Sequence, residues 1–155
     1  MYQKVLVPLD GSELAECVLA HVETLAKGCL LKSLVFVRAA EPFESPSVMA
    51  EYPLKPEDVA RVNAERQESA KSYLQKIAKR TSYENTNITW EVLPGRAAES
   101  IVDYATKNSI DLIVIATHGR SGVSRWVWGS IADRILRSAC VPVLMVRAPG
   151  CYPGI

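Results

Sequence analysis

The chain has 155 residues, which fits one domain able to bury about two-thirds of its unfolded surface. Its apolar fraction of 48%, charged fraction of 23% and formal net charge of +1 exclude a general electrostatic attraction to nucleic acid or to an anionic membrane. The start of the chain lacks the apolar run of a signal peptide, and no stretch reaches the roughly 18 apolar residues of a membrane helix, so we expect a cytoplasmic protein.

The first half of the chain predicts two buried strands, each followed by a helix. Residues 5–8 are a short apolar run, and apolar residues at three- and four-residue steps follow from Leu14 to Leu25. This stripe predicts a helix that Ser12 caps and Gly28 ends. Residues 34–37 are the second apolar run. Residues 41–56 contain four prolines and predict a surface loop, and residues 57–80 predict a long helix.

The second half continues this alternation. Residues 88–93 alternate over their first part, which is typical of an edge strand, and residues 97–108 predict a helix. Residues 112–116 and 143–146 predict buried strands, and the helix between them runs from residue 130 to about residue 139. The whole order predicts an α/β fold: an open five-stranded parallel sheet with helices on both faces, Rossmann-like, in a single domain of residues 1–155.

Ligands of such sheets bind beyond the carboxyl ends of the strands, where the strand order reverses. Two predicted strand ends are rich in glycine and polar residues: residues 7–12, VPLDGS, and residues 116–122, ATHGRSG. Gly119 and Gly122 allow a backbone to approach a ligand closely. Gly129 and Ser130 open the fourth helix, whose unpaired N–H groups favour an anion. From these residues alone, a phosphate site and an ordinary connection capped by Ser130 remain equally open.

Both segments resemble sequences of the universal stress protein family. Residues 111–137, DLIVIATHGRSGVSRWVWGSIADRILR, are similar to the family's C-terminal signature, and residues 4–12, KVLVPLDGS, are similar to its first strand and turn. ATP-binding members carry glycine, two residues, glycine, nine residues, then Gly-Ser or Gly-Thr. This chain has Ala116 at the first of these positions, followed by Gly119, Gly129 and Ser130. The resemblance covers essentially the whole chain.

The resemblance implies an adenine nucleotide alpha hydrolase-like fold and a site for ATP, with Mg²⁺. Pro8 and Asp10 match positions beside the adenosine, and Val37 matches a position whose backbone faces the adenine. Gly119, Gly129 and Ser130 match phosphate contacts. The complete set of candidate nucleotide-binding residues is Pro8, Leu9, Asp10, Val37, Ala116, His118, Gly119, Arg120, Gly122, Gly129, Ser130 and Ile131.

Each of these residues also has a simpler interpretation. Asp10 alternatively orders its own turn, Val37 is equally expected in the core, and Arg120 equally suits a solvated surface. No carboxylate or cysteine is placed by sequence to make His118 a general base, and no P-loop is present. We therefore expect no catalytic residue and at most slow ATP hydrolysis. The cysteines lack the spacing of a zinc site, so we also expect free thiols and no metal ligands.

The leading interpretation is an ATP-binding regulatory protein of the stress response that acts as a nucleotide-dependent switch. The resemblance also implies a homodimer that pairs through the strand from Val143 to Arg147, and an unknown protein partner. The alternative is a dimeric interaction module of the same family that binds no nucleotide. An adenylating or α-phosphate-cleaving enzyme is disfavoured, because Asp10 stands where such an enzyme would hold pyrophosphate.

Overall fold

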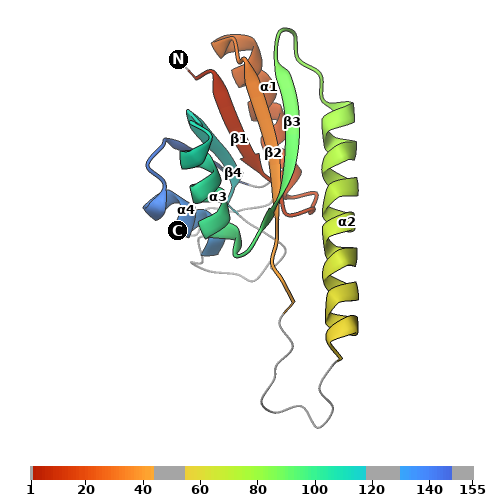
Figure 1. Ribbon diagram of the computed structural model, residues 1–155. Coiled ribbons are helices and arrows are strands. Elements are labelled where there is room, and N and C mark those ends of the chain that lie inside the picture. The colour runs from red at the N-terminus through yellow and green to blue at the C-terminus, as the bar shows by residue number, and fades with distance from the viewer. Residues whose placement is uncertain (1, 44–54, 118–129, 148–155) are drawn as a thin grey trace.

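The computed structural model describes residues 2–43, 55–117 and 130–147. In these residues five strands form one parallel sheet in the order β3-β2-β1-β4-β5. The strands are β1 (Lys4–Pro8), β2 (Ser33–Ala40), β3 (Asn87–Pro94), β4 (Leu112–Ala116) and β5 (Val143–Val146). The chain builds outward from β1 to β3 and then returns to the other side of β1, so the strand order reverses between β1 and β4 (Figure 1). The predicted α/β fold is confirmed, and β3 is an edge strand as its pattern indicates.

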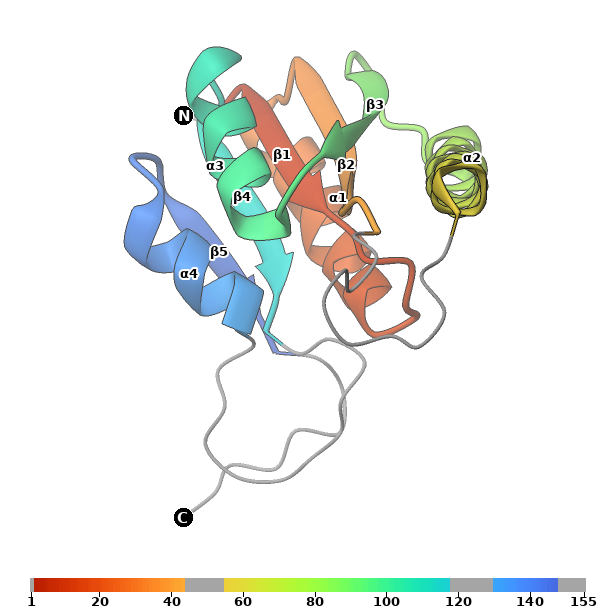
Figure 2. The ribbon, with the colours of Figure 1, turned by 60° about the horizontal axis from the view of Figure 1, so that its bottom comes forward.

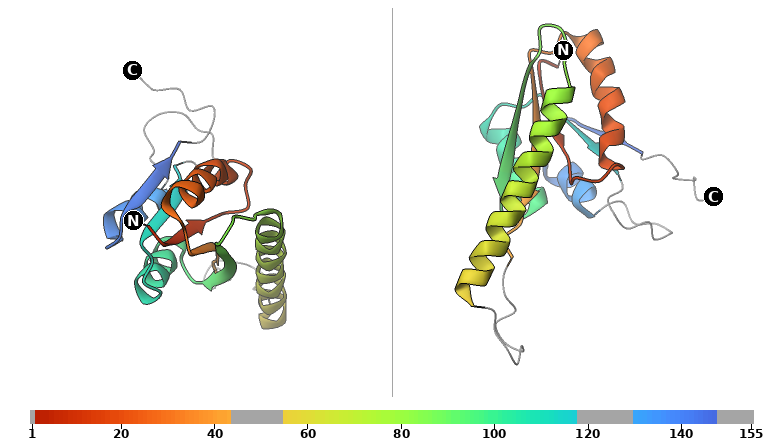
Figure 3. Two further views of the ribbon diagram at one scale, coloured as in Figure 1. Left: turned by 90° about the horizontal axis from the view of Figure 1, so that it is seen from above. Right: turned by 90° about the vertical axis from the view of Figure 1, so that its right-hand side faces the viewer.

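Helices cover both faces of the sheet (Figures 2 and 3). The helical elements are the short 3₁₀ helix η1 (Ala15–Cys17) and the helices α1 (Val18–Cys29), α2 (Pro56–Arg80), α3 (Ala97–Lys107) and α4 (Ser130–Ser138). α1 and α2 pack on one face through a core that includes Val22, Phe36 and Leu74. α3 and α4 pack on the other face around Ile101 and Ile135. Each face of the sheet therefore forms an apolar core with the helices that cover it.

This double cover explains the continuous apolar runs. In β1, Val5 and Val7 belong to the core on the α1 and α2 face, whereas Leu6 belongs to the core on the opposite face. All three side chains are fully buried. Successive strand residues point to opposite faces, so a strand buried on both sides has no polar position. β3 has helix cover and is an edge strand of the described sheet, and its exposure alternates along the strand.

The start and end of the first helix differ from the prediction. Ser12 Oγ accepts a hydrogen bond from the Ala15 N–H at 3.1 Å, at the first residue of η1. α1 begins only at Val18 and has no side-chain cap, so the prediction that Ser12 caps this helix is wrong. Gly28 lies inside α1, so the prediction that it ends the helix is wrong. The left-handed residue after the helix is Leu30, with φ of 55°. Because the next residue, Leu31, is buried in the core, the chain has to turn at residue 30.

The remaining helices match their predicted ranges to within one residue. α2 begins at Pro56, since proline suits the first turn of a helix. The buried residues of α2 all lie in its second half, and its first turns extend past the carboxyl ends of the strands (Figure 1). Residues 44–54 of the predicted loop lie outside the described residues. The part of that loop nearest β2 runs beside α2, where Asn63 Oδ1 accepts a hydrogen bond from the Phe43 N–H at 2.6 Å.

Among the described residues, no helix has both the length and the apolar character needed to cross a membrane. Cys17, Cys29 and Cys140 form no disulfide within the described part of the chain. Within the same ranges, no group of three or more histidine, cysteine or acidic side chains is arranged to hold a metal ion.

Candidate functional site

The carboxyl end of β1 lies beside the second half of β2, and three predicted site residues come together there. Pro8 pairs with Val37 in the sheet register, and the Leu9 N–H donates a hydrogen bond to the Val37 carbonyl at 2.8 Å. The side chains of Leu9 and Val37 are buried in opposite cores. A ligand at this edge would therefore meet the backbone of Val37 and not its side chain, as the family resemblance implies.

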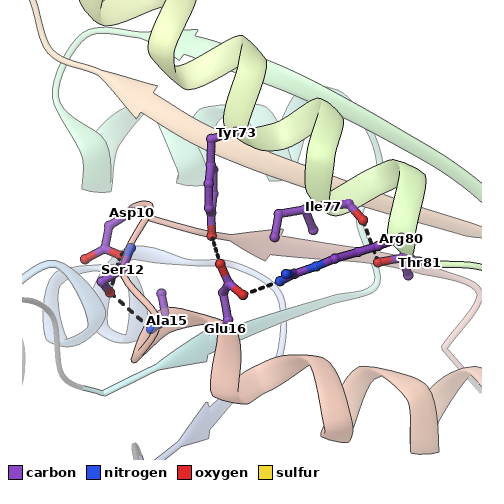
Figure 4. A network of polar contacts seen from close by, with 8 residues as sticks. All are labelled: Asp10, Ser12, Ala15, Glu16, Tyr73, Ile77, Arg80 and Thr81. Atoms are coloured by element: carbon purple, nitrogen blue, oxygen red, sulfur yellow. Dashed lines mark hydrogen bonds and ion pairs between the residues drawn. The ribbon is translucent and has the colours of Figure 1, made fainter.

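Asp10 orders the turn that follows β1. Its Oδ1 accepts hydrogen bonds from the Ser12 N–H at 2.8 Å and from Ser12 Oγ at 2.6 Å (Figure 4). Ser12 Oγ in turn accepts from the Ala15 N–H, so the carboxylate is linked to the start of η1. Asp10 thus orders its own turn, as the simpler interpretation of this residue predicts. No described residue donates a hydrogen bond to its other oxygen, Oδ2.

Gly11 occupies a tight place in this turn. Its φ is +88°, a left-handed conformation that side-chain-bearing residues rarely adopt. A Cβ at Gly11 would lie 2.8 Å from Nη1 and 2.9 Å from Cζ of Arg38. The guanidinium of Arg38 also lies over the ring of Tyr73, with 5.3 Å between Cζ and the ring centroid. Arg38 therefore contacts both the turn and α2.

Tyr73 is held by a polar network that joins α2 to η1 (Figure 4). Its hydroxyl donates a hydrogen bond to Glu16 Oε1 at 3.0 Å, and Arg80 forms an ion pair with Glu16 Oε2. Burial of the phenol raises the pKa of Tyr73 well above its usual value, and the neighbouring negative charges of Glu16 and Asp10 raise it further. The hydroxyl is therefore protonated near neutral pH and acts as a donor.

The second predicted strand end lies across the point where the strand order reverses. Ala116 pairs with Val146, and the Thr117 N–H donates a hydrogen bond to the Val146 carbonyl at 2.8 Å. α4 begins at Ser130 at the same carboxyl edge of the sheet (Figure 2). Ile131, in the first turn of α4, is exposed. The backbone donors of this helix start and the β1 turn thus share one edge.

Several predicted residues of this second segment fall outside the described ranges. They are His118, Gly119, Arg120, Gly122 and Gly129, and the side chain of Ser130 is likewise not described. Their roles in binding remain predictions from the sequence.

The sequence prediction did not include Arg38 and Tyr73. Arg38 directly follows Val37 in β2, and strand alternation places its side chain on the face that α1 and α2 cover. Tyr73 lies 35 positions further along the chain, and its spacing within α2 gives no sign of a partner in β2. A polar residue immediately after a buried strand is the one signal that could have drawn attention to Arg38.

The described groups at this edge are suited to binding. They offer strand-end peptide groups, the carboxylate of Asp10, the guanidinium of Arg38 nearby and the N–H groups of the first turn of α4. A hollow of about 230 Å³ lies elsewhere, between α3 and α4, and the ion pair between Arg134 and Glu99 lies at its wall.

Comparisons with known proteins agree with one another. A sequence model described as the universal stress protein family matches residues 1–147. Universal stress protein MJ0531 of Methanocaldococcus jannaschii is 30% identical over 150 residues, which are 96% of this chain and 84% of that protein. The solved structure of MJ0577 superposes with a TM-score of 0.83 at 24% identity and covers 97% of this chain and 99% of its own. A universal stress protein in complex with cAMP superposes with a TM-score of 0.55 at 22% identity, covering 95% and 98%.

Proposed function

The chain belongs to the universal stress protein family, and from that membership we propose that it is an ATP-binding regulatory protein of the stress response. The single observation that carries this proposal is the shared carboxyl edge, where the turn after β1, the second half of β2 and the start of α4 come together. A relative of the same fold has been solved with cAMP, which supports an adenine nucleotide as the ligand class.

In this proposal the adenosine lies between residues 8–10 and the backbone of Val37. The Val37 carbonyl and Asp10 Oδ2 are the acceptors that would meet the exocyclic amine of the base or the hydroxyls of the ribose. The base would lie on the apolar surface of Pro8. The Val37 carbonyl already accepts a hydrogen bond from the Leu9 N–H and would accept a second one from the ligand. A ligand that lacks the donors would leave Asp10 Oδ2 unpaired.

The polyphosphate, with Mg²⁺, would extend from this point across the reversal of the strand order toward α4. Gly119, Gly129 and Ser130 would supply backbone N–H groups and a hydroxyl, and the positive end of the α4 dipole would favour negative charge. Ala116 stands where ATP-binding relatives have glycine, and a residue with negative φ accepts alanine without strain. The protein would bind ATP as a switch and hydrolyse it slowly at most.

The same proposal extends to the assembly and location of the protein. It would act in the cytoplasm as a single domain of residues 1–155 and as a homodimer. β5 is the outer strand of the described sheet on its side, and Leu144 in it is partly exposed, which supports pairing of residues 143–147 with the same strand of a second copy.

The proposal predicts that Gly119→Val weakens ATP binding by about tenfold or more. A branched side chain would keep the backbone N–H groups from the phosphates, and a hydrogen bond to a charged group is worth about 1.5–3 kcal/mol. Isothermal titration with MgATP measures the affinity directly. Gly28→Val is the matched control, because a Cβ at Gly28 meets no atom within 4 Å. Equal heats from Gly119→Val and the unaltered protein, or no heat from either, would remove the proposal.

The second candidate function is a dimeric interaction module that binds no nucleotide, and Ala116 is the observation that favours it. The nucleotide content of the purified protein distinguishes the two functions. Protein purified without added nucleotide would carry bound adenine nucleotide if the site is functional, and would carry none if the chain acts only as a scaffold.

A further inference from the structure

Arg38 lies in the last part of β2, one residue after the proposed adenine contact at Val37. In the register it pairs with Val92 of the edge strand β3, and its side chain lies on the face covered by α2. The guanidinium touches the backbone of Gly11, since a Cβ there would lie within 2.8–3.1 Å of Nη1, Cζ and Nη2. Arg38 thus supports the turn of Asp10, Gly11 and Ser12 from its α2 side.

The other neighbour of the guanidinium is a fixed aromatic ring. Tyr73 cannot turn away without breaking its hydrogen bond to Glu16, and Glu16 is itself held by Arg80. A guanidinium over an aromatic face is attracted by the ring quadrupole, and its planar shape favours one orientation. The ring therefore determines where Arg38 lies, and Arg38 limits where the backbone of Gly11 can lie.

No described residue accepts a hydrogen bond from Arg38 or forms an ion pair with it. A second arginine over an aromatic ring, Arg66 over Phe43, has the same separation of 5.3 Å from Cζ to the ring centroid. Arg66 differs because it also donates a hydrogen bond to the Glu41 carbonyl at 3.4 Å. The described contacts of Arg38 are thus its packing against the turn and its position over Tyr73.

We propose that Arg38 is a positioning residue: braced on Tyr73, it holds the turn of Asp10, Gly11 and Ser12 in the shape that receives the adenosine. This inference rests on the proposed function for its ligand, but the bracing of the turn is a property of the protein without nucleotide. It assigns α2, through Tyr73, a part in nucleotide affinity although α2 contributes no proposed contact to the ligand.

The test combines two measurements on the full chain: MgATP affinity by isothermal titration, and amide hydrogen exchange of Ser12 and Ala15 without nucleotide. Arg38→Met keeps an unbranched apolar stem at this position and removes the guanidinium and its charge. We expect it to weaken ATP binding by about three- to thirtyfold and to speed exchange of the two amides by at least about threefold. Arg38→Lys should recover part of both losses, because it restores a cation over the ring.

A double-mutant cycle tests the link to α2. Tyr73→Leu should weaken binding to a similar extent, and the double variant Arg38→Met with Tyr73→Leu should be no weaker than the worse single variant within about twofold. Arg66→Met is the matched control and should leave the affinity and both exchange rates within about twofold of the unaltered protein. If the fold-losses of ATP affinity in the two single variants multiply in the double variant, the bracing of Arg38 by Tyr73 is overturned.

The two measurements separate failure of this inference from failure of the proposed function. Unchanged exchange of Ser12 and Ala15 in Arg38→Met would overturn the inference, whatever the affinity for ATP. If the unaltered protein binds no ATP while exchange in Arg38→Met is faster, the bracing stands and the nucleotide proposal fails. If the unaltered protein binds ATP and Arg38→Met binds it equally well, the role of Arg38 in affinity is overturned and the proposed function stands.

Discussion

Gly11→Val is expected to weaken ATP binding by more than about tenfold and to lower the free energy of unfolding by about 2–5 kcal/mol. Two separate effects add. The φ of +88° is unfavourable for any residue with a Cβ by about 1–2 kcal/mol, and the new side chain would collide with Arg38, which adds about 1–3 kcal/mol for overpacking. Relief of the collision requires either the turn or the guanidinium to move, and both movements alter the surroundings of Asp10. Urea denaturation and isothermal titration with MgATP measure the two effects.

Gly95→Val is the control that separates strain from collision. Gly95 has a φ of +91°, nearly that of Gly11, but a Cβ there would meet no atom within 4 Å. We expect this variant to lose about 1–2 kcal/mol of stability and to keep its affinity for ATP. Equal stability losses in the two variants would show that Arg38 does not confine Gly11. Unchanged ATP affinity in Gly11→Val would show that the turn is not part of the nucleotide site.

Phe36→Ala is expected to lower the free energy of unfolding by about 3–5 kcal/mol, the largest loss that we predict for stability. Phe36 is the largest of the fully buried side chains among the described residues. It packs in the core between the sheet and the helices α1 and α2. Its removal takes away the transfer free energy of the ring and leaves a cavity that the rigid strands cannot close. The urea concentration at the midpoint of denaturation should fall, while the slope of the free energy of unfolding against urea concentration (the m-value) should stay the same.

Leu136→Ala provides the comparison for this loss. Leu136 is exposed in α4, and alanine is the best helix former, so we expect a change within about 0.5 kcal/mol. A loss below about 1 kcal/mol for Phe36→Ala would contradict the placement of this ring in the core between the sheet and α2.

The strands and their parallel arrangement could be predicted because burial on both faces leaves a direct trace in the sequence. Residues 5–8, 34–37 and 112–116 are apolar without interruption, and each lies wholly within β1, β2 or β4. The end of α1 could not be predicted in the same way. Gly28 has the chemistry of a helix end, but the turn is placed by the burial of Leu31, which only the assembled core determines.

The candidate site could be predicted in part for similar reasons. Pro8, Leu9 and Val37 meet because Pro8 ends β1 beside Val37 of the neighbouring parallel strand β2, and this follows from the strand order once the family is recognised. The contact of Arg38 with Gly11 and Tyr73 joins three segments that are far apart in the chain. This contact leaves no periodic pattern in the sequence, so only the structure reveals it.

The most direct test of the nucleotide site is a crystal structure of the protein soaked with MgATP. The account predicts an adenine beside the Val37 carbonyl, a ribose or base donor on Asp10 Oδ2, and phosphates directed toward the first turn of α4. An empty carboxyl edge at saturating ATP would contradict it, as would a nucleotide bound instead in the hollow between α3 and α4.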